Sequence, residues 1–159
     1  MLSKIEAIKK LRETNAQTAV KRQRTILAES DQALRDAEDA LVQYKEWRIE
    51  EEQRLYQEII GSSVEMKGLE KVKSQIGKLR QEEENFKKRI IDAKQERDRA
   101  EQDLHRAELA LHEANKALEK CQELVKQIAK DTLAKALRGE ENELEEACEG
   151  LYTNRSQLA

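Results

Sequence analysis

The sequence predicts an all-α fold, a long antiparallel two-helix coiled-coil hairpin with an overhanging C-terminal helix. The chain of 159 residues contains no proline and only five glycines, so it has few residues that favour turns. Charged residues make up 40% of the chain, yet the net charge is only −3, which argues against a disordered segment. Apolar residues recur with a period of 3.5 residues, which is typical of a coiled coil.

The first helix is predicted over residues 1–60. Apolar side chains recur along it in steps of seven, and small or aromatic side chains fill several of the companion positions. Ile5 and Ile8 begin a stripe near the N-terminus, and we expect this stripe to shift register before the main track begins. The main track is Val20, Leu27, Leu34, Leu41, Arg48 and Leu55, the companion positions are Ala16, Ala37 and Tyr44, and the interruptions are Gln23, Ser30 and Glu51.

The hairpin tip is predicted over residues 61–68, where turn-forming residues cluster between the two periodic stretches. Ser62 and Glu65 fit a capping box, in which hydroxyl and carboxylate accept hydrogen bonds from free amides at the start of a helix. Gly61 suits the left-handed conformation that often ends a helix. The tip should therefore reverse the chain between two helices.

The second helix is predicted over residues 69–138 and carries the strongest pattern in the sequence. Alternate steps of three and four residues from Leu69 to Thr132 give 19 positions, of which only Glu83, Arg97 and Thr132 are polar. With a tip centred near residue 64 or 65, residue i of the first helix faces about residue 129 − i of the second. These 19 positions form the apolar seam of the second helix. The seam ends near the residue that faces the start of the first helix, so we expect the two helices to pair with each other.

Residues 139–159 are predicted to form an acidic C-terminal segment, with six glutamates and one arginine. We expect Gly139 to break the helix and a short amphipathic helix to follow, with Leu144, Ala147 and Leu151 on its apolar face. Residues 133–138 prolong an apolar stripe, at Leu133 and Leu137, that has no partner within the hairpin. Residues 1–30 carry a charge of +4, so the two ends either meet different partners or are simply solvated.

The sequence gives no candidate for catalysis, for a metal or for a cofactor. No run is long and apolar enough to span a membrane, and the N-terminus lacks the apolar stretch of a secretory signal. His105 and His112 are seven residues apart, about 10 Å along a helix, which does not suit a shared metal ion. Cys121 lies on the seam and Cys148 in the acidic segment, and both are expected to be reduced thiols in a cytosol. A two-helix rod has no concave site for catalysis, so we expect no enzyme activity.

Residues 44–56 collect the only tryptophan and two of the three tyrosines. A helix pair buries only a stripe, so some of these rings should be exposed, and exposed Trp and Tyr beside Arg are typical of interfaces. The alternative is that Trp47 wraps the edge of the seam. Glu83 should lie within one turn of Arg48, and we predict an ion pair between the two helices that fixes their register.

This segment resembles the YscO family, the stalk proteins of bacterial type III secretion systems and relatives of flagellar FliJ. The resembling residues are Trp47-Arg48-Ile49-Glu50-Glu51-Glu52-Gln53-Arg54-Leu55-Tyr56, then Leu69-Glu70-Lys71, Gln75-Ile76 and Leu79-Arg80. The resemblance implies a non-enzymatic two-helix rod that acts as central stalk of the hexameric secretion ATPase. It also implies binding to the cytoplasmic domain of the export gate and to translocator chaperones, in the bacterial cytoplasm beside the inner-membrane apparatus.

Two sets of contact residues follow from the resemblance and from the charge pattern. By analogy with rotary shafts, residues 1–24 and 120–138 would enter the ATPase ring. The residues expected to face the ATPase are Lys9, Lys10, Arg12, Lys21, Arg22 and Arg24. Those expected to bind other partners near the tip are Trp47, Arg48, Glu51, Glu52, Gln53, Arg54, Leu55 and Tyr56.

Two other classes of protein fit a long charged hairpin. One is a coiled-coil scaffold that dimerises through Leu133 and Leu137, whereas a self-paired hairpin is expected to be a monomer. The other is a nucleic-acid-binding helical arm, whose binding would weaken steeply with salt. The acidic segment and the intermixed glutamates argue against nucleic acid as a partner.

Overall fold

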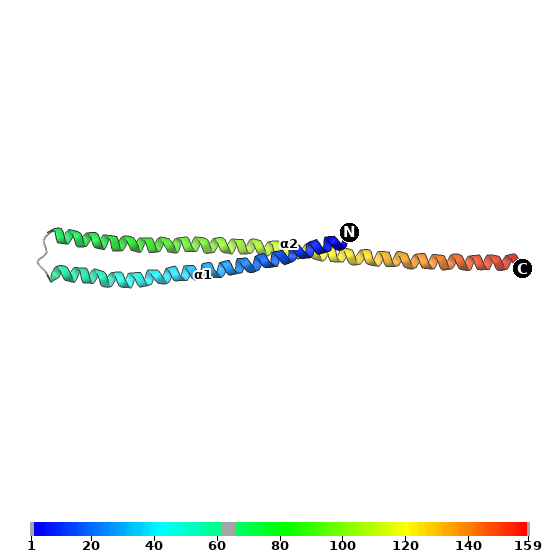
Figure 1. The fold of residues 1–159 in the computed structure, drawn as a ribbon, viewed down its shortest axis with the longest axis horizontal. Coiled ribbons are helices and arrows are strands. Elements are labelled where there is room, and N and C mark those ends of the chain that lie inside the picture. The colour runs from blue at the N-terminus through cyan, green and yellow to red at the C-terminus, as the bar shows by residue number, and fades with distance from the viewer. Residues whose placement is uncertain (1, 62–65, 159) are drawn as a thin grey trace. The chain divides into compact units, whose positions relative to one another are not determined.

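Two helices account for nearly all of the residues that the computed structural model describes, which are 2–61 and 66–158, with side chains as far as Thr153. Helix α1 spans Leu2–Ile60 and helix α2 spans Met66–Leu158 (Figure 1). No strand occurs in these two ranges. The structure confirms the predicted all-α class and the two-helix hairpin.

The helices divide into two units, residues 18–109 and residues 1–17 with 110–159. In the unit of residues 18–109, α1 and α2 lie side by side (Figure 1). Asp31 of α1 pairs with Arg97 of α2. Arg48 comes later in α1, and its partner Glu83 comes earlier in α2. The pairing is antiparallel, within two residues of the register predicted from the sequence.

Burial in this unit follows the predicted seam. Val20, Leu55, Ile76 and Ala100 are its most buried side chains, and every predicted seam position between them is at least half-buried. A period of 3.5 residues keeps one stripe of each helix facing the other, because the supercoil removes the drift of a straight helix. With only two helices, each side chain is covered from one side, and few become fully buried.

In the unit of residues 1–17 and 110–159, Leu118 and Cys121 are the most buried side chains. The expected shift of register near the N-terminus is wrong. Ile5 and Ile8 are exposed, whereas the half-buried positions before Ala16 are Leu2, Glu6, Lys9 and Glu13. The helix contains no insertion that would shift a heptad, so the inward positions continue at the same period, and long polar side chains can cover the seam with their methylene stems.

Two expected roles of glycine are also wrong. Gly61 has no positive φ, and its amide donates an ordinary helical hydrogen bond to the carbonyl of Gln57 at 3.0 Å. Gly139 does not break the helix, because α2 continues to Leu158. A glycine in a helix costs about 1 kcal/mol relative to alanine, and the strong helix formers around residue 139 offset that cost. The predicted capping box of Ser62 and Glu65 lies outside the described residues.

Residues 126–153 of α2 have no covering helix in the described part of the chain, and all of their side chains are exposed. The exposed leucines on this stretch are Leu133, Leu137, Leu144 and Leu151. For Leu133 and Leu137 this agrees with the prediction that they have no partner within the hairpin. Within the described ranges, neither helix holds a segment apolar and long enough to cross a membrane.

Candidate interaction surface

A layer of charged side chains interrupts the apolar seam at Arg48. Its Nη1 donates to Glu52 at 2.8 Å, and its Nε lies 3.0 Å from a carboxylate oxygen of Glu83 on α2. Lys45 lies 3.9 Å from Glu83, and Arg80 lies 3.4 Å from Glu52. The predicted ion pair between the helices is confirmed, as part of a network. The hydrogen bond to Glu52 raises the pKa of Arg48, so the guanidinium stays charged.

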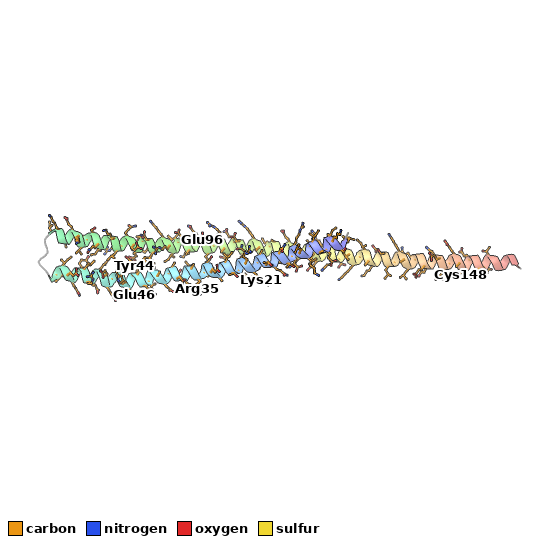
Figure 2. The ribbon with its side chains drawn as sticks, viewed as in Figure 1. Lys21, Arg35, Tyr44, Glu46, Glu96 and Cys148 are labelled. Carbon is orange, nitrogen blue, oxygen red and sulfur yellow. The ribbon has the colours of Figure 1, made fainter. Side chains whose placement is uncertain are left out.

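An aromatic cluster lies next to this layer. The Tyr44 hydroxyl donates to the carbonyl of Leu79 at 2.6 Å, and its ring stacks on Phe86 with centroids 4.7 Å apart. Figure 2 shows Tyr44 between the two helices. Burial raises the pKa of Tyr44, and the carboxylate of Glu82 raises it further. Both the hydroxyl and the ring of Tyr44 therefore tie α1 to α2.

Trp47 lies at the edge of this cluster. Its ring centroid is 5.7 Å from that of Tyr44, yet 49% of the residue remains exposed. It therefore contacts the seam and also presents a large apolar surface to solvent. Arg54 is held along α1 by ion pairs to Glu51 and Glu58, and its hydrogen bond lowers the pKa of Glu51.

The eight residues predicted to bind partners near the tip do not form one surface. Trp47 and Tyr56 are nine residues apart, about two and a half helical turns, so they lie on opposite faces of α1. Leu55 is buried in the seam, and Arg48 and Glu52 belong to the charged layer. Trp47 and Arg54, two turns apart, share one flank of α1, while Tyr56 and Gln53 belong to the side away from α2.

Sequence reasoning missed two parts of this region. Phe86 is one of the 19 predicted seam positions, but its ring contacts were not predicted: it stacks on Tyr44, and Arg89 lies over its ring, 4.8 Å from the centroid. Val42 and Ile49 are exposed and precede Tyr56 at intervals of seven residues. The seven-residue spacing of these three residues can be read from the sequence. It was missed because the seam on the other face of α1 has a longer and more regular apolar repeat.

The basic residues predicted to face the ATPase are spread along α1 and between the two units. Lys9, Lys10 and Arg12 belong to residues 1–17, and the others to residues 18–109. All six are exposed except Lys9, which is half-buried. Among the described residues, none of the six forms an ion pair within the chain. Their charges are therefore available to an acidic partner.

None of the residues weighed for metal or thiol chemistry belongs to this region. His105 and His112 are exposed on α2, Cys121 is buried in the seam, and Cys148 is exposed (Figure 2). The part of the chain with described side chains contains no group of three His, Cys, Asp or Glu residues placed to hold a metal ion.

Comparison with known proteins finds relatives for both the sequence and the fold. The family model described as type III secretion protein YscO matches residues 2–150. The "Yop proteins translocation protein O" of Yersinia pseudotuberculosis is 34% identical over 86 residues, which are 54% of this chain and 56% of that protein. The match thus spans little more than half the length of that relative.

Two solved structures have a similar fold. The crystal structure of type III secretion protein YscO from Vibrio parahaemolyticus superposes with a TM-score of 0.86, at 30% identity over 92% of both chains. The structure of a YscO homologue from Chlamydia trachomatis superposes with a TM-score of 0.79. It is 24% identical, covering 98% of this chain and 96% of that one, and supports the fold alone.

Proposed function

Because the chain belongs to the YscO family of type III secretion proteins, we propose that it is a non-enzymatic stalk and adaptor of the export apparatus. It binds the hexameric secretion ATPase, the cytoplasmic domain of the export gate and translocator chaperones, from the cytoplasmic side of the inner membrane. The family match over residues 2–150 carries the proposal, and the fold shared with the Vibrio protein supports it.

The features of residues 1–17 and 110–159 support contact with the ATPase. Lys10 and Arg12 are exposed and carry charge that no described residue neutralises. Leu133 and Leu137 expose apolar surface on a stretch of α2 that no described residue covers. Exposed apolar side chains and unneutralised charges both suit a protein partner that buries them. We assign the ATPase to this end of the hairpin.

The assignment is tested with the purified secretion ATPase. Reversing the charge of Lys9, Lys10 and Arg12 to glutamate should abolish stimulation of ATP hydrolysis. The matched control reverses three exposed lysines near the tip, Lys71→Glu, Lys73→Glu and Lys78→Glu, and should leave stimulation unchanged. Equal loss in both variants, or no loss in the first, would overturn the assignment.

The flank that carries Trp47 and Arg54 is proposed to bind the export gate or a chaperone. Replacing both residues with alanine should abolish that binding in a pull-down with purified partners and leave ATPase stimulation intact. Tyr56→Ala is a separate variant, because it lies on the opposite face of α1. If the Trp47 and Arg54 double variant lost ATPase stimulation but still bound the export gate or chaperone, the two partner assignments would have to be exchanged.

The exposed leucines of residues 126–153 favour one other candidate, a scaffold that dimerises through this stretch. Molar mass in solution separates the two functions. A stalk that pairs only with itself runs as a monomer of 18.4 kDa, and a scaffold runs at twice that mass.

A further inference from the structure

A second apolar stripe runs along α1 near the tip, on the side of the helix away from the seam. Val42, Ile49 and Tyr56 follow one another at seven-residue intervals, and they are 55%, 49% and 49% exposed. Glu46 and Gln53 fall between them, and Ile60 ends the series. The steps of four and three residues are the same as those of the seam, so α1 carries a coiled-coil pattern on two faces.

This stripe is peculiar to α1. On α2, the positions facing away from the seam near the tip are polar or glycine: Glu70, Ser74, Gly77, Gln81 and Glu84. Ile91 of α2 is 55% exposed, but the residues seven positions before and after it, Glu84 and Asp98, are charged. It is therefore an isolated exposed side chain, whereas the three side chains on α1 repeat in register at seven-residue intervals on one face.

The charge beside the strip is acidic. Asp39, Glu46 and Glu50 lie next to Val42 and Ile49 on the outer side of α1, and none of these carboxylates has an ion-pair partner among the described residues. Two of the nearby bases are engaged, since Lys45 lies beside Glu83 and Arg54 binds Glu51 and Glu58. Arg35, seven residues before Val42, is exposed without an ion pair among the described residues and marks the basic end of the strip. A ligand for this face needs apolar side chains at helical spacing and positive charges on both sides of them.

We propose that the outer face of α1 formed by Val42, Ile49, Tyr56 and Ile60 is the docking site for an amphipathic helix of a partner protein with lysine or arginine flanking its apolar stripe. The added helix packs knobs-into-holes along the strip, and its bases pair with Glu46 and Glu50. A second copy of the same face is disfavoured, because it would set acidic flanks against each other. The proposal deepens the proposed function, in that a component of the secretion apparatus supplies the helix.

The test uses the full chain and two synthetic 28-residue peptides. Both have leucine at the a and d heptad positions, and they carry either lysine or glutamate at e and g. The lysine charges keep that peptide from pairing with itself. Fluorescence anisotropy at 50 mM salt should show that the lysine peptide binds at least tenfold more tightly than the glutamate peptide. Raising the salt to 500 mM should weaken the lysine peptide's binding, because exposed charges are then screened.

Variants locate the contact. Ile49→Gln with Tyr56→Gln should weaken binding of the lysine peptide at least tenfold, whereas Ile91→Gln, a substitution at an equally exposed site on α2, should leave it unchanged. Glu46→Lys with Glu50→Lys should reverse the preference towards the glutamate peptide. All five positions are exposed, so helix content and melting temperature should not change, and circular dichroism checks that the variants remain folded.

Three results would overturn the proposal. The first is that the lysine peptide fails to bind the wild-type chain. The second is that Ile91→Gln weakens its binding as much as Ile49→Gln with Tyr56→Gln does, and the third is that its binding is unchanged in that double variant. ATPase stimulation, measured in the same variants, keeps the two proposals apart. If stimulation by the wild-type chain is normal and the peptide result fails, only the docking site is wrong. If the wild-type chain gives no stimulation, the stalk function is wrong whatever the peptides do.

Discussion

Arg48 and Glu83 show how a polar pair can occupy a coiled-coil seam. Their side chains are only 16% and 13% exposed, and each has two partners of opposite charge within 4 Å. Such a pair adds little stability compared with two apolar side chains, because removing both charges from water costs about as much as their attraction returns. Its effect is on alignment, since a shift of one helix past the other would leave a charge in an apolar layer.

Arg48→Leu should therefore lower the free energy of unfolding by about 1–3 kcal/mol, because Glu83 is left in the seam without its closest base. Adding Glu83→Leu should raise the melting temperature above that of the single variant, since both seam positions are then apolar. The control is Arg99→Leu, which removes an exposed pair with Glu96 and should cost less than about 1 kcal/mol. A double variant that melts no higher than either single variant would mean that the pair does not couple the helices.

Tyr44 allows a prediction about pH. Its folded pKa is raised by burial, so below pH 10 it is protonated in both states and its full contribution is present. Above pH 10 the unfolded state loses the proton first, and stability falls as pH rises towards the folded pKa. Tyr44→Phe should cost about 1 kcal/mol at neutral pH by removing the hydrogen bond to Leu79. Denaturant unfolding from pH 8 to 11 should show this difference shrinking above pH 10, and a constant difference would contradict the account.

At the scale of the helices, the seam was predictable because it depends on a repeat that each residue reinforces. From Val72 to Val125 every position of the predicted track is at least half-buried. The errors arose where one residue was given too much weight. Ile5 and Ile8 looked like a new register, but a continuous helix cannot change the face it presents over a few residues. Gly139 looked like a stop, although a single glycine costs little in a long helix.

The candidate site was less predictable than the seam. Composition identified residues 44–56 as unusual, but it could not say which side of α1 each residue occupies relative to α2. Trp47 and Tyr56 lie on opposite faces because they are nine residues apart, and composition, which groups them together, does not take that spacing into account. The stacking of Tyr44 on Phe86 depends on the exact register of the tip, which turn composition places only to within a few residues.

Two glycines of α2 distinguish its paired and unpaired parts. A Cβ added at Gly77 or at Gly139 meets no atom within 4 Å, so alanine fits at both. Gly77→Ala lies in the paired unit and should raise the midpoint of global unfolding by the equivalent of about 1 kcal/mol. Gly139→Ala lies in the uncovered stretch and should slow amide hydrogen exchange around residue 139 without moving the midpoint. Equal midpoint shifts would mean that residues 126–153 unfold together with the helix pair.

At the scale of the whole molecule, every interpretation depends on one chain whose two helices pair with each other. The same seam positions could in principle pair with a second copy, and burial alone would look similar. The distance within one molecule distinguishes the two arrangements, because only pairing within one chain places residues 35 and 96 of that same chain beside each other. If the chain did not fold back, these residues would be about 90 Å apart along a continuous helix.

The most direct measurement is the distance between spin labels at Arg35 and Glu96, both of which are exposed (Figure 2). Helix axes about 8–10 Å apart, plus the reach of the two labels, predict a distance of about 15–30 Å. Dilution with excess unlabelled chain should leave that distance unchanged. A distance above about 60 Å, or a short distance that disappears on dilution, would contradict a hairpin formed within one molecule.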